Sequence, residues 1–215
     1  MDRSPARCLF LCAAFALAST PVLGADGPRF EITPFAAARA GGGFDVREQA
    51  TGEARAVDLD RGAGFGLDLG LYAHPAGLYE LLYSTQRAGL DAADPALAGL
   101  DVRVDYLQVG GTALFPHERG FVPYLSMTLG ATFLEPTRGG YDAETKFSGS
   151  LGGGLRFPVG DRLNVVLGLR GYVTLLDSDT KLFCLSAPPE GRCLLEASGS
   201  TLFQAEAQLG VSLAF

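Results

Sequence analysis

The stretch GSTLFQAEAQLGVSLAF, residues 199–215, decides the fold of this chain. Its side chains alternate strictly between apolar and polar or small, with Leu202 and Ala214 as exceptions near the two ends. A strand of this length with one oily and one wet face is what a membrane-spanning β-barrel requires, because lipid lies outside such a barrel and polar groups lie inside. The apolar face consists of Phe203, Ala205, Ala207, Leu209, Val211, Leu213 and Phe215, and the other face of Gln204, Glu206, Gln208, Gly210 and Ser212.

The same period-two alternation recurs along the rest of the chain and predicts further strands. In the segment from Val102 to Phe115 the apolar parity changes halfway, which predicts a β-bulge near Tyr106. Counting the last stretch, the total is an even number that can close, so the predicted fold class is an all-β, eight-stranded antiparallel transmembrane β-barrel. The other predicted strands are Arg29–Arg39, Gly62–Tyr72, Leu78–Arg87, Val102–Phe115, Phe121–Phe133, Phe147–Phe157 and Leu163–Leu175.

The connections between these strands alternate between tight turns and long segments. The tight turns, at 74–77, 116–120 and 158–162, are rich in Pro and Gly. Short turns on one side and long loops on the other are typical of outer-membrane barrels, so we expect the turns in the periplasm and the loops outside the cell. The phenylalanines at 30, 115, 121, 157 and 215 lie beside the tight-turn end and predict an aromatic girdle there.

The first residues predict an export signal. Arg3 and Arg7 precede an apolar run from Cys8 to Ala18, and small residues then offer a cleavage site between Gly24 and Ala25. We therefore expect a signal peptide at residues 1–24 and the barrel domain at residues 25–215. The formal charge of -7 becomes -8 when the +1 of Asp2, Arg3 and Arg7 is removed, and such an acidic chain is a poor candidate for binding nucleic acid.

The two cysteines of the predicted mature chain indicate the compartment. Cys184 and Cys193 lie in one long connection, and export passes through an oxidising space, so we expect a local disulfide between them. Zinc is the rival interpretation, but no histidine lies nearby in the sequence to complete a ligand set.

The inward faces of the predicted strands carry charges of both signs. Strands one and eight must be neighbours in a closed barrel, so Arg39 and Glu206 are expected to pair. An eight-stranded barrel is barely wide enough for its own side chains, which predicts a polar lumen that plugs itself rather than an open pore. We also expect Leu167→Arg on the lipid face to lower the stability by roughly 2 to 4 kcal/mol and Gly168→Ser on the lumen face to lower it far less. The charged residues of this predicted lumen network are Glu31, Arg39, Asp68, Glu80, Arg156, Arg170 and Glu206.

Signals for catalysis and cofactors are weak. His74 and His117 both lie in tight turns, and neither belongs to a zinc-protease motif. The glycine runs at 62–66 and 152–154 have neither the strand-to-helix context nor the Gly-Lys-Ser/Thr of a nucleotide loop, so we interpret them as strand glycines. We expect no enzyme activity, no cofactor and no metal.

Four segments resemble the small eight-stranded outer-membrane proteins of Gram-negative bacteria, the OmpA-like and OmpW-like β-barrels. They are FEITPF at 30–35, YELLYS at 79–84, VGGT at 109–112 and GVSLAF at 210–215. The resemblance implies an outer-membrane location. The terminal Phe215 also resembles the signal by which the barrel-assembly machinery recognises its clients. The other segments indicate membership more than mechanism.

Three functions compete, and a fourth interpretation lies outside the membrane. We favour a structural or surface-interaction barrel with a plugged lumen and long loops that contact an extracellular partner. An OmpW-like conduit for small hydrophobic molecules would prefer an apolar upper lumen, where the sequence offers Arg39, Gln204, Glu206 and Gln208. A lipid A-modifying barrel enzyme would need a histidine on the outer side, opposite to where both histidines are expected. A soluble lipocalin would place the leucines inside, and it leaves the terminal aromatic unexplained.

Overall fold

The computed structural model describes the chain over most of the predicted barrel. The predicted signal peptide at residues 1–24 lies outside the described residues. No helix long and apolar enough to cross a membrane occurs in the part of the chain that is described. The described residues are 29–42, 44–47, 54–91, 101–116, 120–137, 143–176, 181–184, 193–197 and 201–215.

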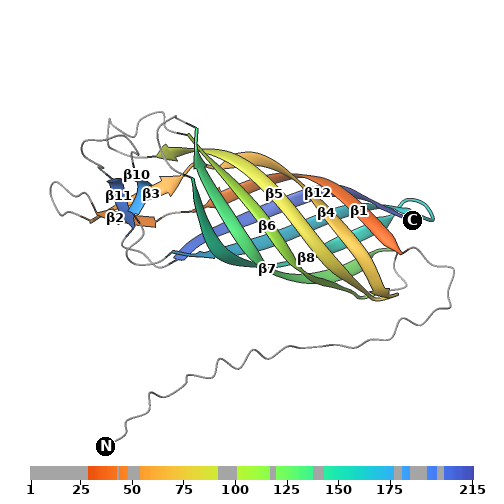
Figure 1. The fold of residues 1–215 in the computed structure, drawn as a ribbon. Helices are drawn as coiled ribbons and strands as arrows, with labels where there is room; N and C mark the ends of the chain where they lie inside the picture. Colours follow the sequence, from red (N-terminus) through yellow and green to blue (C-terminus); the bar gives the residue numbers. More distant parts are fainter. Residues whose placement is uncertain are drawn as a thin grey trace, which may run out of the picture.

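Eight long strands form a closed antiparallel barrel (Figure 1). Each strand pairs with the next one of the barrel along the chain, and the first and last strands pair with each other from Glu31 opposite Ala214 to Gly41 opposite Gln204. Closure leaves no barrel edge with unpaired backbone groups, which lipid would not tolerate. The predicted fold class is therefore confirmed. The barrel strands are β1 (Phe30–Gly41), β4 (Gly62–His74), β5 (Gly77–Asp91), β6 (Asp101–Leu114), β7 (Val122–Pro136), β8 (Glu144–Pro158), β9 (Leu163–Leu175) and β12 (Thr201–Ala214).

The bulge predicted near Tyr106 is wrong. The pairing of β6 with β5 and with β7 advances by one residue at a time through this region. Val102, Val104 and Tyr106 are all buried, and they point into the barrel like Gln108 further down the strand. The apolar residues of β6 change from one face to the other for another reason. At the loop end its inward positions are apolar and its outward positions are polar.

The long connections contain four short strands that the sequence pattern did not predict. They are β2 (Phe44–Arg47), β3 (Ala54–Leu59), β10 (Lys181–Cys184) and β11 (Cys193–Ala197). They form a sheet in the order β10-β11-β2-β3, and β3 continues it onto β5 through Leu59 opposite Leu90. Figure 1 shows this sheet beyond the barrel, at the end opposite to the C-terminus. We call it the loop-end sheet.

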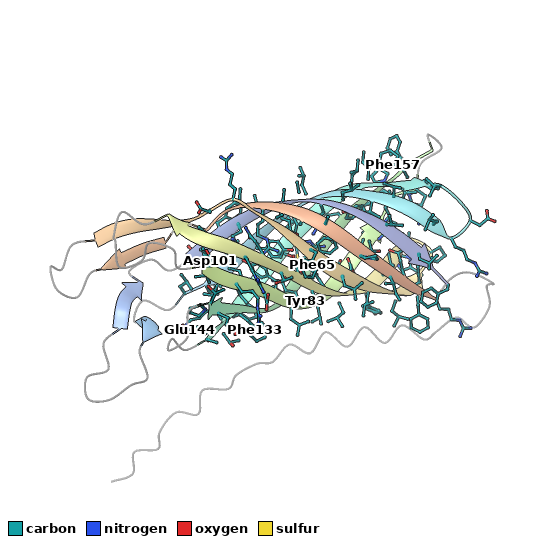
Figure 2. All side chains as sticks on the ribbon, turned by 90° about the horizontal axis from the view of Figure 1, so that it is seen from above. Phe65, Tyr83, Asp101, Phe133, Glu144 and Phe157 are labelled. Atoms are coloured by element: carbon teal, nitrogen blue, oxygen red, sulfur yellow. The ribbon has the colours of Figure 1, made fainter. Side chains whose placement is uncertain are left out.

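The outer surface of the barrel is a broad apolar belt. Figure 2 shows side chains projecting outward from the barrel, with Phe157 near one end and Asp101 and Glu144 near the other. Phe30 lies beside Phe215 at the tight-turn end, with the two rings tilted and 6.4 Å between their centroids. In water such a surface would be a strong driver of aggregation, whereas in a bilayer it is required. Large apolar side chains on this belt that are at least half exposed include Phe65, Leu125, Met127, Leu129, Phe147, Leu151, Leu169, Phe203 and Leu209.

Two inward glycines lie where the barrel wall leaves no room for a side chain. A Cβ at Gly110 would run into the backbone of β7 at Met127 and Thr128. A Cβ at Gly168 would meet the Tyr124 hydroxyl and would lie 3.2 Å from Gln208 Oε1. A side chain at Gly168 would have to displace the Tyr124 hydroxyl, and the expectation that Gly168→Ser is far milder than Leu167→Arg stays a prediction.

Candidate functional site in the lumen

The lower lumen, at the tight-turn end, is organised around Glu31 of β1. Its carboxylate lies 2.7 Å from Arg156 Nη1 of β8, across the barrel from it. Tyr72 donates a hydrogen bond of 2.8 Å to the same carboxylate, and Thr33 donates one of 3.3 Å. The guanidinium of Arg156 also lies over the ring of Tyr124, 5.5 Å from its centroid. Glu31 is thus held by one charged and two neutral donors, as a buried carboxylate must be.

A second ion pair crosses the middle of the lumen. Arg170 Nη2 of β9 lies 2.6 Å from Glu80 Oε1 of β5, and Thr112 donates a hydrogen bond of 2.5 Å to the other oxygen of that carboxylate. Asp68 and both arginines of the lower and middle lumen line a cavity of about 20 Å³, which has room for one or two water molecules. Within the described residues, Arg156 Nε and Arg170 Nε are buried without a hydrogen-bond partner. Water in this cavity would be a suitable acceptor for them.

The third ion pair, between Arg39 and Glu206, lies above the other two. The residues are opposite each other in the β1–β12 ladder, and Arg39 Nε and Nη2 lie 2.8 and 2.5 Å from Glu206 Oε2. Both side chains are fully buried. The guanidinium lies 4.9 and 5.0 Å from the ring centroids of Tyr106 and Tyr172, which stack on each other at 4.1 Å. The carboxylate also accepts hydrogen bonds from Ser84, Tyr172 and Gln208.

Above this pair aliphatic side chains predominate in the lumen, together with Gln86, Gln204 and the Lys146–Glu144 pair of β8, whose charged atoms lie 3.2 Å apart. Seven aliphatic side chains from β3, β5, β6, β7, β12 and the end of β9 face inward at the loop end, and none is more than 6% exposed. We call them the apolar cap. Its members are Leu59, Ala88, Val102, Val104, Leu134, Leu176 and Leu202. Leu202, an exception to the alternation in the sequence, is therefore part of the lumen filling rather than an irregularity.

A polar cluster lies on the outer face at the same height. Arg103 of β6 pairs with Asp105 at 3.0 Å and with Glu135 of β7, and Asp105 accepts a hydrogen bond of 2.5 Å from Thr85. Arg103 and Asp105 share the outward face of β6 with Leu107, and they lie one step beyond the apolar belt. The outer surface therefore changes from apolar to charged where a bilayer would give way to water.

The structure brings together part of the predicted site. All seven charged residues of the predicted network face the lumen, and Arg39 meets Glu206 as the strand order required. Tyr106 and Tyr172, which hold the Arg39 guanidinium, were missed, although both are aromatic residues at inward positions. Cys184 and Cys193 are opposite each other in the β10–β11 ladder, so their backbones are placed as a disulfide needs, while the bond itself stays a prediction.

The candidate catalytic residues do not form a site. His74 is exposed in the turn between β4 and β5, where its Nδ1 accepts a hydrogen bond of 3.1 Å from the Ala76 amide. His117 lies outside the described residues. Within the described ranges, no group of three metal-ligating side chains comes together.

No family model matches the chain, and no curated protein matches it in sequence. Among solved structures, the barrel is similar to the neisserial surface protein NspA, with a TM-score of 0.57 at 13% identity over 86% of this chain and 97% of the other. It is similar to the outer-membrane protein AlkL, with a TM-score of 0.59 at 12% identity over 100% and 96%. The outer-membrane protein OprG of Pseudomonas aeruginosa gives a TM-score of 0.53 at 12% identity over 89% and 98%.

The chain has the fold of an outer-membrane β-barrel. The similarity extends over nearly the whole length of each of these proteins. The apolar belt supplies the independent physical reason for an outer-membrane location, since a closed barrel with this exterior is stable only in lipid.

Proposed function

We propose that this protein is an integral outer-membrane barrel whose lumen is closed by its own side chains and whose function is carried out at the cell surface by the loop-end sheet. The observation that carries the proposal is the set of three buried ion pairs at different heights of the lumen, each completed by neutral donors. Side chains that satisfy one another at three heights leave no continuous path for hydrated ions. The proposal involves no catalysis and no cofactor.

The surface part of the proposal rests on the loop-end sheet. Four segments of the connections on this side are paired into one sheet rather than left separate. An ordered platform of this kind suits contact with an extracellular partner. We further propose that Phe215 and the strand before it are read by the barrel-assembly machinery, and that residues 1–24 are removed on export.

Single-channel recording in planar bilayers tests the closed lumen. We expect the unmodified protein to insert without a steady conductance. A variant with Arg39→Ser and Arg170→Ser, checked for folding by heat-modifiable electrophoretic migration, should admit small ions and shows that the assay can detect opening. A stable ohmic channel in the unmodified protein would overturn the closed-lumen proposal.

The disulfide between Cys184 and Cys193 belongs to the surface part of the proposal. It would fasten the β10–β11 hairpin, whose ladder sets the two residues opposite each other. In the exported protein, a thiol-reactive label should modify neither cysteine until a reductant is added. Full labelling of both without reductant would rule the disulfide out.

A second candidate function is a conduit for small apolar molecules. The sequence argues against a conduit because it predicts polar residues, among them Arg39 and Glu206, in the upper lumen. In the structure Arg39 and Glu206 lie below the apolar cap, whose aliphatic side chains offer a surface that such a molecule prefers, beside the polar Gln204 and the Lys146–Glu144 pair. Uptake of a small apolar solute into proteoliposomes, faster than into protein-free vesicles, would support this candidate over a purely structural barrel.

A further inference from the structure

Two arginines lie side by side on the outer face of the barrel at the loop end. Arg87 of β5 is opposite Arg103 of β6 in the ladder, and both side chains point outward, on the same face as Tyr83 and Leu107. Residues directly opposite each other have Cβ atoms about 4.5 to 5.5 Å apart, and like charges in that position destabilise a sheet. The repulsion between the two guanidinium groups therefore has to be offset by negative charge.

The charge of Arg103 is offset within the protein. Its Nε lies 3.0 Å from Asp105, and its Nη2 contacts Glu135 of β7. Asp105 is itself held by a hydrogen bond from Thr85. Because Asp105 lies two residues nearer the apolar belt, the guanidinium of Arg103 is drawn toward the belt and fixed there. Within the described residues, these contacts leave the N–H groups of Arg103 Nη1 without an acceptor.

The charge of Arg87 is not offset in the same way. Its side chain is exposed, and no carboxylate among the described residues forms an ion pair with it. An anion from outside the protein that contacts both Arg87 and the Nη1 of Arg103 would supply the missing charge. The planar fork of an arginine matches the oxygens of a phosphate group in particular.

The position of the two arginines identifies the source of that phosphate. The second outward pair below them is Tyr83 opposite Leu107, and these side chains are 40% and 44% exposed. They belong to the apolar belt, and a bilayer that covers the belt places its polar head groups at the height of the arginines. A molecule with a phosphate at that height and acyl chains against Tyr83 and Leu107 is a membrane lipid.

We propose that Arg87 and Arg103 bind the terminal phosphate of a lipid in the leaflet at the loop end. A phosphomonoester presents three acceptor oxygens, so it can accept hydrogen bonds from Arg103 Nη1 and from the fork of Arg87 at once. A phosphodiester is linked on both sides and presents only two free oxygens, so it fits this pair less well. The site lies on the outer wall of the barrel, and it stands whether the lumen is closed or conducts apolar molecules.

The test is a titration of the folded protein in detergent with short-chain phosphatidic acid, which carries a phosphomonoester, and with phosphatidylglycerol, which carries a phosphodiester. Native mass spectrometry counts the lipid that stays bound to the barrel. Phosphatidic acid should bind about 3- to 10-fold more tightly than phosphatidylglycerol, as one additional hydrogen bond allows. Arg87→Gln should weaken the binding of phosphatidic acid about 5-fold, which is what one arginine at a lipid surface contributes.

Arg162→Gln is the matched control, because it removes an exposed arginine at the tight-turn end. It should leave the affinity for phosphatidic acid unchanged, and heat-modifiable migration checks that both variants fold. Equal affinity of the unmodified protein for the two lipids would overturn the site, and so would a loss in Arg87→Gln no larger than that in Arg162→Gln. Complete displacement of the lipid by inorganic phosphate would also overturn it, because the site would then take free phosphate rather than a lipid.

Discussion

Removing the negative charge of the Arg39–Glu206 pair tests the energetics of the lumen most sharply. In Glu206→Gln, the Arg39 guanidinium loses the negative charge of the carboxylate whose Oε2 lies 2.8 Å from Nε and 2.5 Å from Nη2, in a place with no solvent to replace it. Leaving one partner of a buried pair uncompensated costs about 3 to 5 kcal/mol. Tyr106 and Tyr172 still shield the cation, so we place the loss of unfolding free energy at the lower end, about 3 kcal/mol.

The reverse change, Arg39→Met, leaves the carboxylate with its neutral donors Ser84, Tyr172 and Gln208. We expect a similar loss of about 3 kcal/mol, because the ion is again unpaired in the lumen. The double variant leaves no unpaired ion and should lose about 2 to 3 kcal/mol less than the sum of the two single changes.

Urea unfolding in phospholipid vesicles, followed by far-UV circular dichroism, measures the unfolding free energies of the unmodified protein, the two single variants and the double variant. The Arg103–Glu135 pair on the outer rim is the matched control. Its side chains are 40% and 50% exposed, so Arg103→Met with Glu135→Gln should show a coupling of about 0.5 kcal/mol. Losses at Arg39 and Glu206 that add within about 0.5 kcal/mol would refute the reasoning.

Two further predictions concern the wall of the barrel. Leu167→Arg, on the lipid face of β9, should lower the unfolding free energy by about 2 to 4 kcal/mol. Leu163→Arg, at the tight-turn end of the same face, should cost about 0 to 1 kcal/mol. Equal losses would mean that the face or the depth is misassigned. Gly110→Ala should cost about 1 to 3 kcal/mol because its Cβ meets the backbone of β7, while Gly160→Ala, with open space around it, should be nearly neutral in the same unfolding assay.

The fold could be predicted from the sequence because alternation and turn chemistry both act locally. Along β9 and β12 every second side chain faces lipid, so the pattern reports the environment directly. The pair of Arg39 and Glu206 followed from strand order, since closure makes β1 and β12 neighbours. The loop-end sheet could not be predicted in this way, because its short strands pair across distant connections and alternation over four to six residues carries little information.

The error at β6 has a physical explanation that applies to other barrels. Alternation identifies the face of a strand only while the two environments stay the same along it. At the loop end the outer face enters water and takes Arg103 and Asp105, while the lumen closes with Val102 and Val104. The pattern inverts without any irregularity of the backbone. The ion pairs of Arg156 and Arg170 were missed for a different reason, because they cross the lumen between strands that are not neighbours.

The central claim is that apolar side chains face lipid and polar ones face the lumen. The chain has no tryptophan, so a single introduced tryptophan reports its surroundings without background. Val173 points outward and Tyr172 inward at the same depth of β9, which makes Val173→Trp and Tyr172→Trp a matched pair. In vesicles of brominated lipid, fluorescence of the tryptophan at 173 should be strongly quenched and that at 172 should not. Equal quenching of the two, or quenching only at 172, would contradict the account.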